Sequence, residues 1–108
     1  MNSLFFGCSS LTSINFDKFR TKNAITMSRM FYNCSSITYL NLNSFNTSKV
    51  ERMDEMFYGC SGLIDLYILN FVGNSLINYT NMFRGASTTM TIYAKYEFSE
   101  ILNSLEAG

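Results

Sequence analysis

One phrase recurs along the chain at a spacing of 26 residues. The copy MFYNCSSITYL begins at Met30, the copy MFYGCSGLIDL begins at Met56, and an earlier copy, LFFGCSSLTSI, begins at Leu4. A fixed period of this length is typical of proteins that stack similar units, because one unit alone is too small to enclose a core. The repeat therefore restricts the fold to a stack of similar coils.

Aligned copies of the phrase give columns of chemically similar residues. The second position is phenylalanine in every copy, and the fifth position is cysteine except in the last copy, which has Ala86. Such columns predict ladders, in which the same position of successive units makes contact. The expected core ladder consists of Phe5, Phe31, Phe57, Phe83, Cys8, Cys34 and Cys60.

Two local patterns alternate within each unit. The end of ITYLNL, residues 37–42, alternates apolar and polar residues, as a short half-buried strand does. Residues 50–57 instead have an apolar stripe with helical spacing, and Ser48 and Glu51 have the spacing of a capping box. We therefore expect a short strand and a short helix in each unit. The equivalent helical stripes cover residues 24–31 and 76–83.

Neither of these elements is stable alone in water, so neighbouring units must supply the contacts. The predicted fold class is an α/β repeat: a solenoid with a short parallel sheet on one side and short helices on the other. Residues 1–94 are expected to hold about three and a half repeats. The expected units are residues 4–29, 30–55 and 56–81, followed by the degenerate unit 82–94.

The last part of the chain, residues 95–108, departs from the repeat. Phe98, Ile101, Leu102 and Leu105 have the spacing of one face of an amphipathic helix. Because an open solenoid needs its last unit covered, this segment is predicted to be a C-terminal capping helix.

The cysteine column favours packing over chemistry. A position that also accepts Ala86 needs a small apolar side chain, and free cysteine is commonly buried. A metal site needs about four converging ligands, and the chain contains no histidine. An odd number of cysteines, one per repeat, also argues against disulfide pairing. Packing is the preferred interpretation, a redox or metal role is the alternative, and we expect neither a metal nor a cofactor.

Composition excludes several classes of function. The 8 basic and 8 acidic side chains balance, so the chain offers no field that would attract nucleic acid. No apolar run approaches the roughly 18–20 residues of a membrane span. Without histidine, Ser-His and Cys-His catalytic arrangements are impossible. The carboxylates of Glu51, Asp54 and Glu55 are interpreted as a solvated helix face, so the chain is not expected to be an enzyme.

The unit MFYNCSSITYLNLNSFNTSKVERMDE, which begins at Met30, resembles the repeat of the BspA-type leucine-rich-repeat family. The matching signature is M-F-x-x-C-S-x-L-x-x-L-x-L-x-x-F-x-T-S-x-V-x-x-M, and the resemblance covers residues 4–94. Membership implies a leucine-rich-repeat-like, right-handed solenoid. It also implies a bacterial surface protein or lipoprotein in an extracellular setting, with adhesion or host-protein binding and no catalytic residues. The third repeat departs from the signature at ILNFVGNS, residues 68–75, and the ligand stays open.

Protein binding through the exposed strand face is the first functional hypothesis. Tyrosine is enriched in protein interfaces, although the tyrosines of this face are also explained by cross-strand packing. A stalk that spaces another domain from the cell surface, and an intracellular scaffold, are the alternatives. Self-association through an uncapped N-terminal repeat is also expected to be available. The candidate partner-binding residues are Tyr39, Asn41, Asp65, Tyr67, Thr91 and Tyr93, on a face that also includes Ser13, Asn15, Asp17, Asn43 and Leu69.

Overall fold

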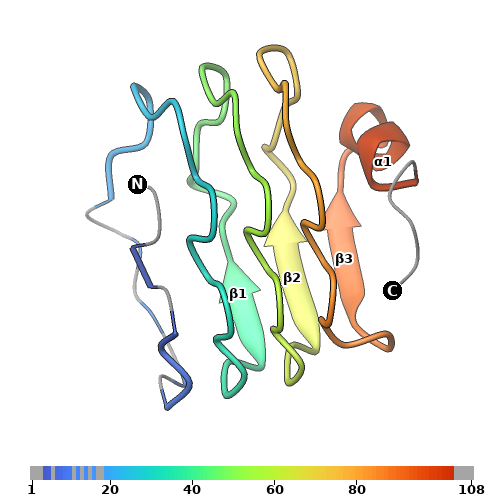
Figure 1. Ribbon diagram of the computed structural model, residues 1–108. Helices are drawn as coiled ribbons and strands as arrows, with labels where there is room; N and C mark the ends of the chain where they lie inside the picture. The colour runs from blue at the N-terminus through green and yellow to red at the C-terminus, as the bar shows by residue number, and fades with distance from the viewer. Residues whose placement is uncertain are drawn as a thin grey trace.

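Three short parallel strands and one helix are the regular elements of the part of the chain that the structure describes, residues 4–103 without 6, 11, 13, 15, 17 and 18. The structure is a computed structural model (Figure 1). The strands form one sheet in the order β1-β2-β3. The elements are β1 (Tyr39–Asn41), β2 (Asp65–Ile68), β3 (Thr91–Ala94) and α1 (Tyr96–Asn103).

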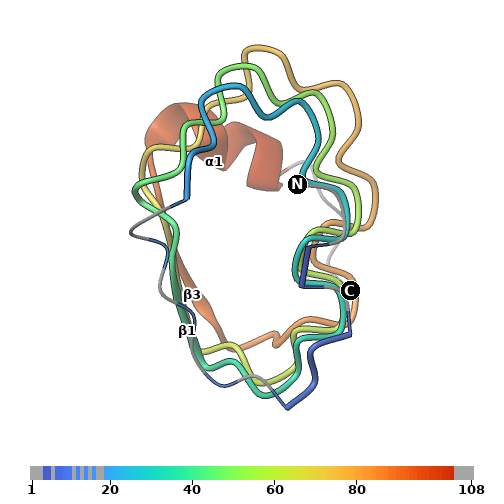
Figure 2. The ribbon, with the colours of Figure 1, turned by 90° about the vertical axis from the view of Figure 1, so that its left-hand side faces the viewer.

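The chain follows the same path in successive coils. Figure 1 shows the coils side by side, and Figure 2 shows that they superimpose around one outline, of which the sheet is one wall. Leu66 in β2 pairs with Leu40 in β1 and with Ile92 in β3, each 26 residues away. Columns of the sequence are therefore neighbours in space.

The strands have one buried and one open face. Leu40 and Leu66 point inward and are 1% and 0% exposed. Tyr39 and Asn41, on either side of Leu40, are exposed. This alternation follows from strand geometry, in which successive side chains lie on opposite faces of the sheet.

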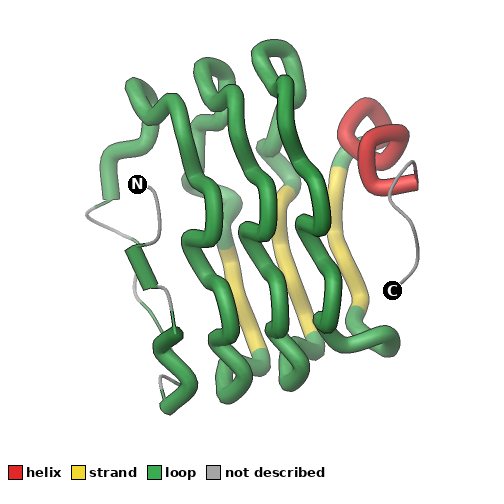
Figure 3. The backbone as a smooth tube through the Cα atoms, viewed as in Figure 1, coloured by secondary structure: helices red, strands yellow, loops and turns green. Residues whose placement is uncertain are grey.

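Outside the sheet, most of the coil consists of turns (Figure 3). We call residues 27–33, 53–59 and 79–85 the turn segments. In the first of them, every second N–H points to the next coil, as when Phe31 donates to the carbonyl of Met56 at 2.9 Å. The N–H groups between them bond locally, as when Met30 donates to the carbonyl of Met27 at 3.3 Å. The backbone thus alternates between binding the next coil and closing a turn on itself.

This hydrogen-bond pattern replaces the short helices that the sequence predicted. An α-helix bonds each N–H to the carbonyl four residues earlier, whereas these N–H groups bond between coils or three residues back. Arg29 and Glu55 also have φ angles of 56° and 57°, which a right-handed helix excludes. The prediction was therefore wrong for residues 24–31, 50–57 and 76–83, which form turns and isolated bridges.

The capping box predicted from Ser48 and Glu51 is also absent. The Ser48 N–H bonds to the side-chain oxygen of Asn46 at 3.0 Å, and the Glu51 N–H donates to the carbonyl of Ile25 at 2.7 Å. Successive turns bury residues three or four apart, such as Met53, Met56 and Phe57. The same spacing marks one face of a helix, so the apolar stripe did not distinguish the two structures.

Aromatic ladders run through the core. Phe31 and Phe57 are fully buried, and their rings lie 5.6 Å apart and nearly parallel. Phe5 extends this stack at 5.5 Å on one side, and Phe83 extends it at 5.1 Å on the other. Full burial of one such ring contributes about 1.5–3 kcal/mol, so the ladder is a major part of the stability of the stack.

Helix α1 lies against the end of the stack (Figure 1). Phe98 is 1% exposed and meets the ring of Phe71 edge-on, at 5.6 Å between ring centres. Gly73 leaves space for Ile101, whose side-chain terminus would collide with any Cβ added to that glycine. The equivalent residue one coil earlier is Thr47, whose hydroxyl donates to the carbonyl of Val72 at 3.0 Å. The coil that contacts α1 therefore has glycine where the preceding coil has threonine, and this glycine makes room for the helix.

Several predictions fall outside the described residues. The predicted capping segment 95–108 is helical over Tyr96–Asn103, and residues 104–108 are not described. In the first repeat, the described residues include Phe5 and Cys8, both half-buried. The positions expected to extend the strand face there, Ser13, Asn15 and Asp17, are not described.

Candidate interaction face

The sheet brings all six candidate residues onto one open surface. Tyr39 and Asn41 come from β1, and Tyr39 is 52% exposed. Strand β2 adds the half-buried Asp65 and Tyr67, and β3 adds the exposed Thr91 and Tyr93. We call these six residues the strand face.

The three tyrosines of the strand face form a row across the strands. The rings of Tyr67 and Tyr93 lie 4.3 Å apart and are inclined by 5°. The rings of Tyr39 and Tyr67 lie 5.4 Å apart and are inclined by 51°. The difference follows from the register, because Tyr67 is directly opposite Tyr93, whereas Tyr39 is opposite Asp65 and meets Tyr67 diagonally.

Two contacts between polar groups of the strand face are long. The Tyr93 hydroxyl lies 3.5 Å from the carboxylate of Asp65, and the Asn41 amide lies 3.5 Å from the Tyr39 hydroxyl. Burial, followed by the proximity of Tyr93, raises the pKa of Tyr67. A hydrogen bond between the side chains of Tyr67 and Tyr93 acts in the same direction and joins β2 to β3 on this face.

Two apolar side chains beside the strand face were not among the candidate binding residues. Ile64 is 58% exposed immediately before β2, and Leu69 is 39% exposed immediately after it. Leu69 was expected on this side from the strand alternation, but Ile64 was not. The available signal was that Ile64 stands where the two preceding copies have Thr12 and Thr38, although the last copy also has an apolar residue there, Met90.

The cysteines lie in the core and bond between coils. Cys34 and Cys60 are both 0% exposed, and Cys8 is half-buried. The thiols of Cys34 and Cys60 donate to the carbonyls of Phe5 and Phe31, each at 3.1 Å. Burial raises the pKa of Cys34 to about 11 and that of Cys60 to about 12. These thiols are held protonated, which is unfavourable for nucleophilic or metal-binding chemistry.

A polar cluster occupies the turn segments. Asp54 is 9% exposed and accepts hydrogen bonds from Ser28 at 2.5 Å and from Arg52 at 3.0 and 3.1 Å. Burial alone would raise the pKa of Asp54, but the bonds from Arg52 and Ser28 lower it. Beside it, Arg29 and Glu55 form an ion pair at 2.7 Å between Nε and Oε1.

The solvated helix face predicted from Glu51, Asp54 and Glu55 is therefore wrong for Asp54, which joins two coils through Ser28. The residues around Asp54 line a pocket of about 330 Å³. Every polar side-chain atom buried there already has a partner within the described structure. The cluster is thus a structural connection between coils.

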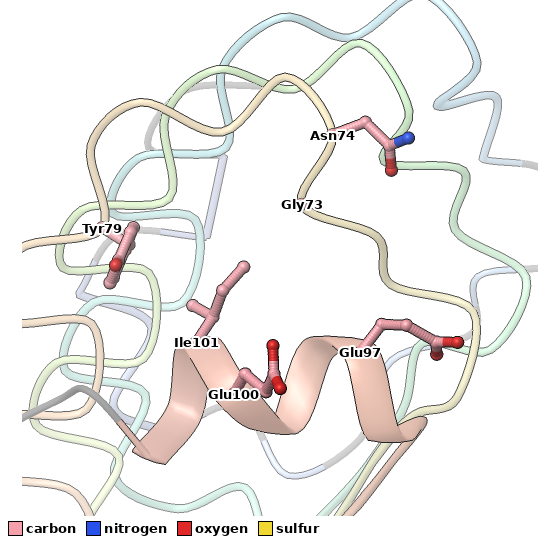
Figure 4. Close-up of a pocket in the computed structure, with 6 residues that line it drawn as sticks. All are labelled: Gly73, Asn74, Tyr79, Glu97, Glu100 and Ile101. Atoms are coloured by element: carbon pink, nitrogen blue, oxygen red, sulfur yellow. The ribbon is translucent and has the colours of Figure 1, made fainter.

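A second pocket, of about 410 Å³, lies between α1 and the last coil (Figure 4). Glu97 and Glu100 line it from the helix, and Asn74 and Tyr79 line it from the coil. Its polar groups are spread over an open surface rather than directed at one point. Nowhere in the described residues do three or more His, Cys, Asp or Glu side chains gather as metal ligands would.

Comparison with known proteins identifies the family. Over residues 1–104, the chain matches the family described as "Mycoplasma protein of unknown function, DUF285", and the chain belongs to this family. Comparisons with curated proteins and with solved structures gave no match. No helix within the described part of the chain has the length and apolar character needed to cross a membrane.

Proposed function

We propose that this chain is a non-catalytic protein-binding module of a bacterial cell-surface protein and that the strand face contacts the partner. The observation that carries the proposal is the row of three tyrosines across adjacent strands, with Tyr39 and Tyr93 open to solvent. Tyrosine combines a large apolar surface with a hydroxyl donor and is enriched where proteins bind one another.

The surroundings of the tyrosine row support the same proposal. Ile64 and Leu69 add exposed apolar area at either end of β2, and Asp65 provides a negative charge between the tyrosines. Exposed apolar groups beside polar ones are typical of a protein interaction surface.

We further propose that the family is of the BspA leucine-rich-repeat type and that the protein is extracellular. The repeat signature supports this assignment, together with parallel strands repeated every 26 residues. The right-handed sense of the solenoid belongs to the same proposal. In this setting the partner is a host extracellular or surface protein, and the module mediates adhesion.

The test replaces the tyrosine row and leaves the core unchanged. A variant with Tyr39→Ser, Tyr67→Ser and Tyr93→Ser is compared with the parent for binding to a panel of purified matrix and serum proteins. We expect a partner of the parent protein to bind the variant at least about tenfold more weakly, since a lost interface tyrosine costs about 1–2 kcal/mol or more.

The matched control removes tyrosines from a different part of the coil. Tyr32 and Tyr58 stack at 4.6 Å and are half-buried, but they are not in the sheet. A Tyr32→Ser, Tyr58→Ser variant should keep the affinity of the parent. Equal affinities of parent and triple variant would refute the strand face as the binding site. Absence of any partner would favour the spacer function.

A further inference from the structure

Among the residues that the structure describes, Asp65 is the one partly covered acidic side chain without a basic partner. The acidic side chains there that are not fully exposed are Asp54, Glu55 and Asp65. Arg52 donates to Asp54 at 3.0 and 3.1 Å, whereas Arg29 donates to Glu55 at 2.7 Å. The contact of the Asp65 carboxylate with the Tyr93 hydroxyl is long, at 3.5 Å. A carboxylate that loses part of its water without gaining a cation is in an unfavourable environment.

The repeat places no basic side chain of this chain beside Asp65. Thr91 of β3 is directly opposite Asp65, and Lys95 stands four residues beyond Thr91. At about 3.3 Å per residue, this separation is roughly 13 Å along the sheet, and no ion pair joins the two side chains. The basic side chain outside the described residues is Lys18, whose equivalent in the coil of Asp65 is Asn70. A cation for this carboxylate therefore has to come from another molecule.

The neighbours of Asp65 suit the guanidinium group of arginine. Tyr39 lies opposite Asp65 in β1, and Tyr93 brings its hydroxyl toward the carboxylate from β3. Both tyrosines are exposed, at 52% and 37%. Arginine can pair with a carboxylate through two parallel N–H groups while its flat face lies against an aromatic ring, whereas lysine offers a point charge. The paired carboxylates of this chain are also bonded by arginines.

We propose that the strand face takes an arginine side chain of its protein partner, with the guanidinium paired to Asp65 and packed beside the rings of Tyr39 and Tyr93. This inference rests on the proposed function, since it names the chemistry of the partner at the same surface. Charge complementarity carries it, because the carboxylate at the centre of the tyrosine row is the charge that the chain itself leaves unpaired. Association is then expected to weaken as salt rises.

The test measures NMR shifts of the full chain with two synthetic probes. One is the capped tripeptide Gly-Arg-Gly, and the other has citrulline, a neutral side chain of the same shape, in place of arginine. The arginine peptide should shift the resonances of Asp65, Tyr39 and Tyr93 and bind at least about tenfold more tightly than the citrulline peptide. An Asp65→Asn variant should lose this preference, with unchanged amide resonances in β2 and β3 as the check of its fold.

The matched control is Glu97→Gln, which neutralises an exposed carboxylate of α1 and should keep the preference for the arginine peptide. Equal binding of the two peptides, or a preference that survives Asp65→Asn, would overturn the inference. The proposed function fails separately. If a partner binds the Asp65→Asn variant normally but the triple tyrosine variant weakly, the strand face remains the binding site and only the arginine is wrong. Normal binding of that partner to the triple variant refutes the strand face itself.

Discussion

The thiol of Cys60 donates a hydrogen bond to the backbone carbonyl of Phe31, with 3.1 Å between sulfur and oxygen. Cys34 makes the same contact with Phe5 in the preceding coil. The cysteine column thus joins successive coils through directional bonds, in addition to filling space between them.

Replacing Cys60 by alanine should lower the free energy of unfolding by about 1–2 kcal/mol, because a buried sulfur and its hydrogen bond are lost. The smaller side chain fits, since the same column contains Ala86. Urea unfolding followed by circular dichroism measures the change. The neighbouring Ser61 is exposed, and Ser61→Ala should have little effect. Equal stability of parent and Cys60→Ala would show that neither the packing of the sulfur nor its hydrogen bond stabilises the fold.

Stability should decline in alkaline solution. The pKa of Cys34 is about 11 and that of Cys60 is about 12 in the folded protein, against an ordinary value of 9.0. Because thiols of the unfolded chain ionise first, their stabilising effect is complete below about pH 9 and is lost as the pH rises toward the folded values. Urea unfolding at about pH 8 and about pH 10.5 tests this. A Cys34→Ala, Cys60→Ala variant should show a weaker decline, and an identical decline would contradict the assignment.

The carboxylate of Asp54 should make the stability of the protein decline in acidic solution, whereas the thiols make it decline in alkaline solution. Its pKa is lowered by hydrogen bonds from Arg52 and Ser28 that outweigh burial. The stabilisation is present above the ordinary value of 3.8 and is lost as the pH falls through the lower folded value. The Asp54→Asn variant should have a free energy of unfolding about 1–3 kcal/mol lower at neutral pH. Its stability should also depend less on pH in acidic solution. Unfolding at neutral pH and near pH 3 measures both, and an unchanged acid dependence in the variant would count against this role.

Replacing Gly73 by threonine, the residue at the equivalent position one coil earlier, should displace α1. In the Gly73→Thr variant, the new side chain collides with Ile101. We therefore expect the packing of Phe98 to loosen and the free energy of unfolding to fall by about 1–3 kcal/mol. Combining Gly73→Thr with Ile101→Ala removes the collision, and the double variant should be more stable than the sum of single effects predicts. Strict additivity in this cycle, measured by urea unfolding, would show that the two residues do not compete for space.

The 26-residue repeat made it possible to predict which residues of neighbouring coils lie side by side. The 26-residue spacing predicts that Leu66 lies between Leu40 and Ile92, and the register has this pairing. The local backbone was not predictable in the same way. Residues 50–57 have helical apolar spacing, yet Glu55 has a φ angle of 57°. Hydrogen bonds to another coil determine that conformation, and no local pattern reports them.

The strand face was predictable because alternation in a strand assigns side chains to faces. The polar cluster was predictable only in part: Ser28 and Asp54 are 26 residues apart, so the repeat makes them neighbours, but the apolar stripe assigned Asp54 to a solvated helix face rather than to a buried contact. The effect of Gly73 was also hidden, because its significance depends on Ile101 in a helix outside the repeat.

The inter-coil N–H groups of the first two turn segments all point toward the last coil, which gives this wall of the stack a local electrical polarity, whereas N–H groups elsewhere, such as those of Ile64 and Ile77, point back to the preceding coil. Peptide dipoles aligned in this way add, with their positive end toward the last coil, as they do along an α-helix. The side chains oppose this field. Residues 1–50 have five basic and one acidic side chain, a net charge of +4, and residues 51–108 have three basic and seven acidic, a net charge of −4. An overall neutral chain thus has its negative half toward the positive end of the dipoles in this wall.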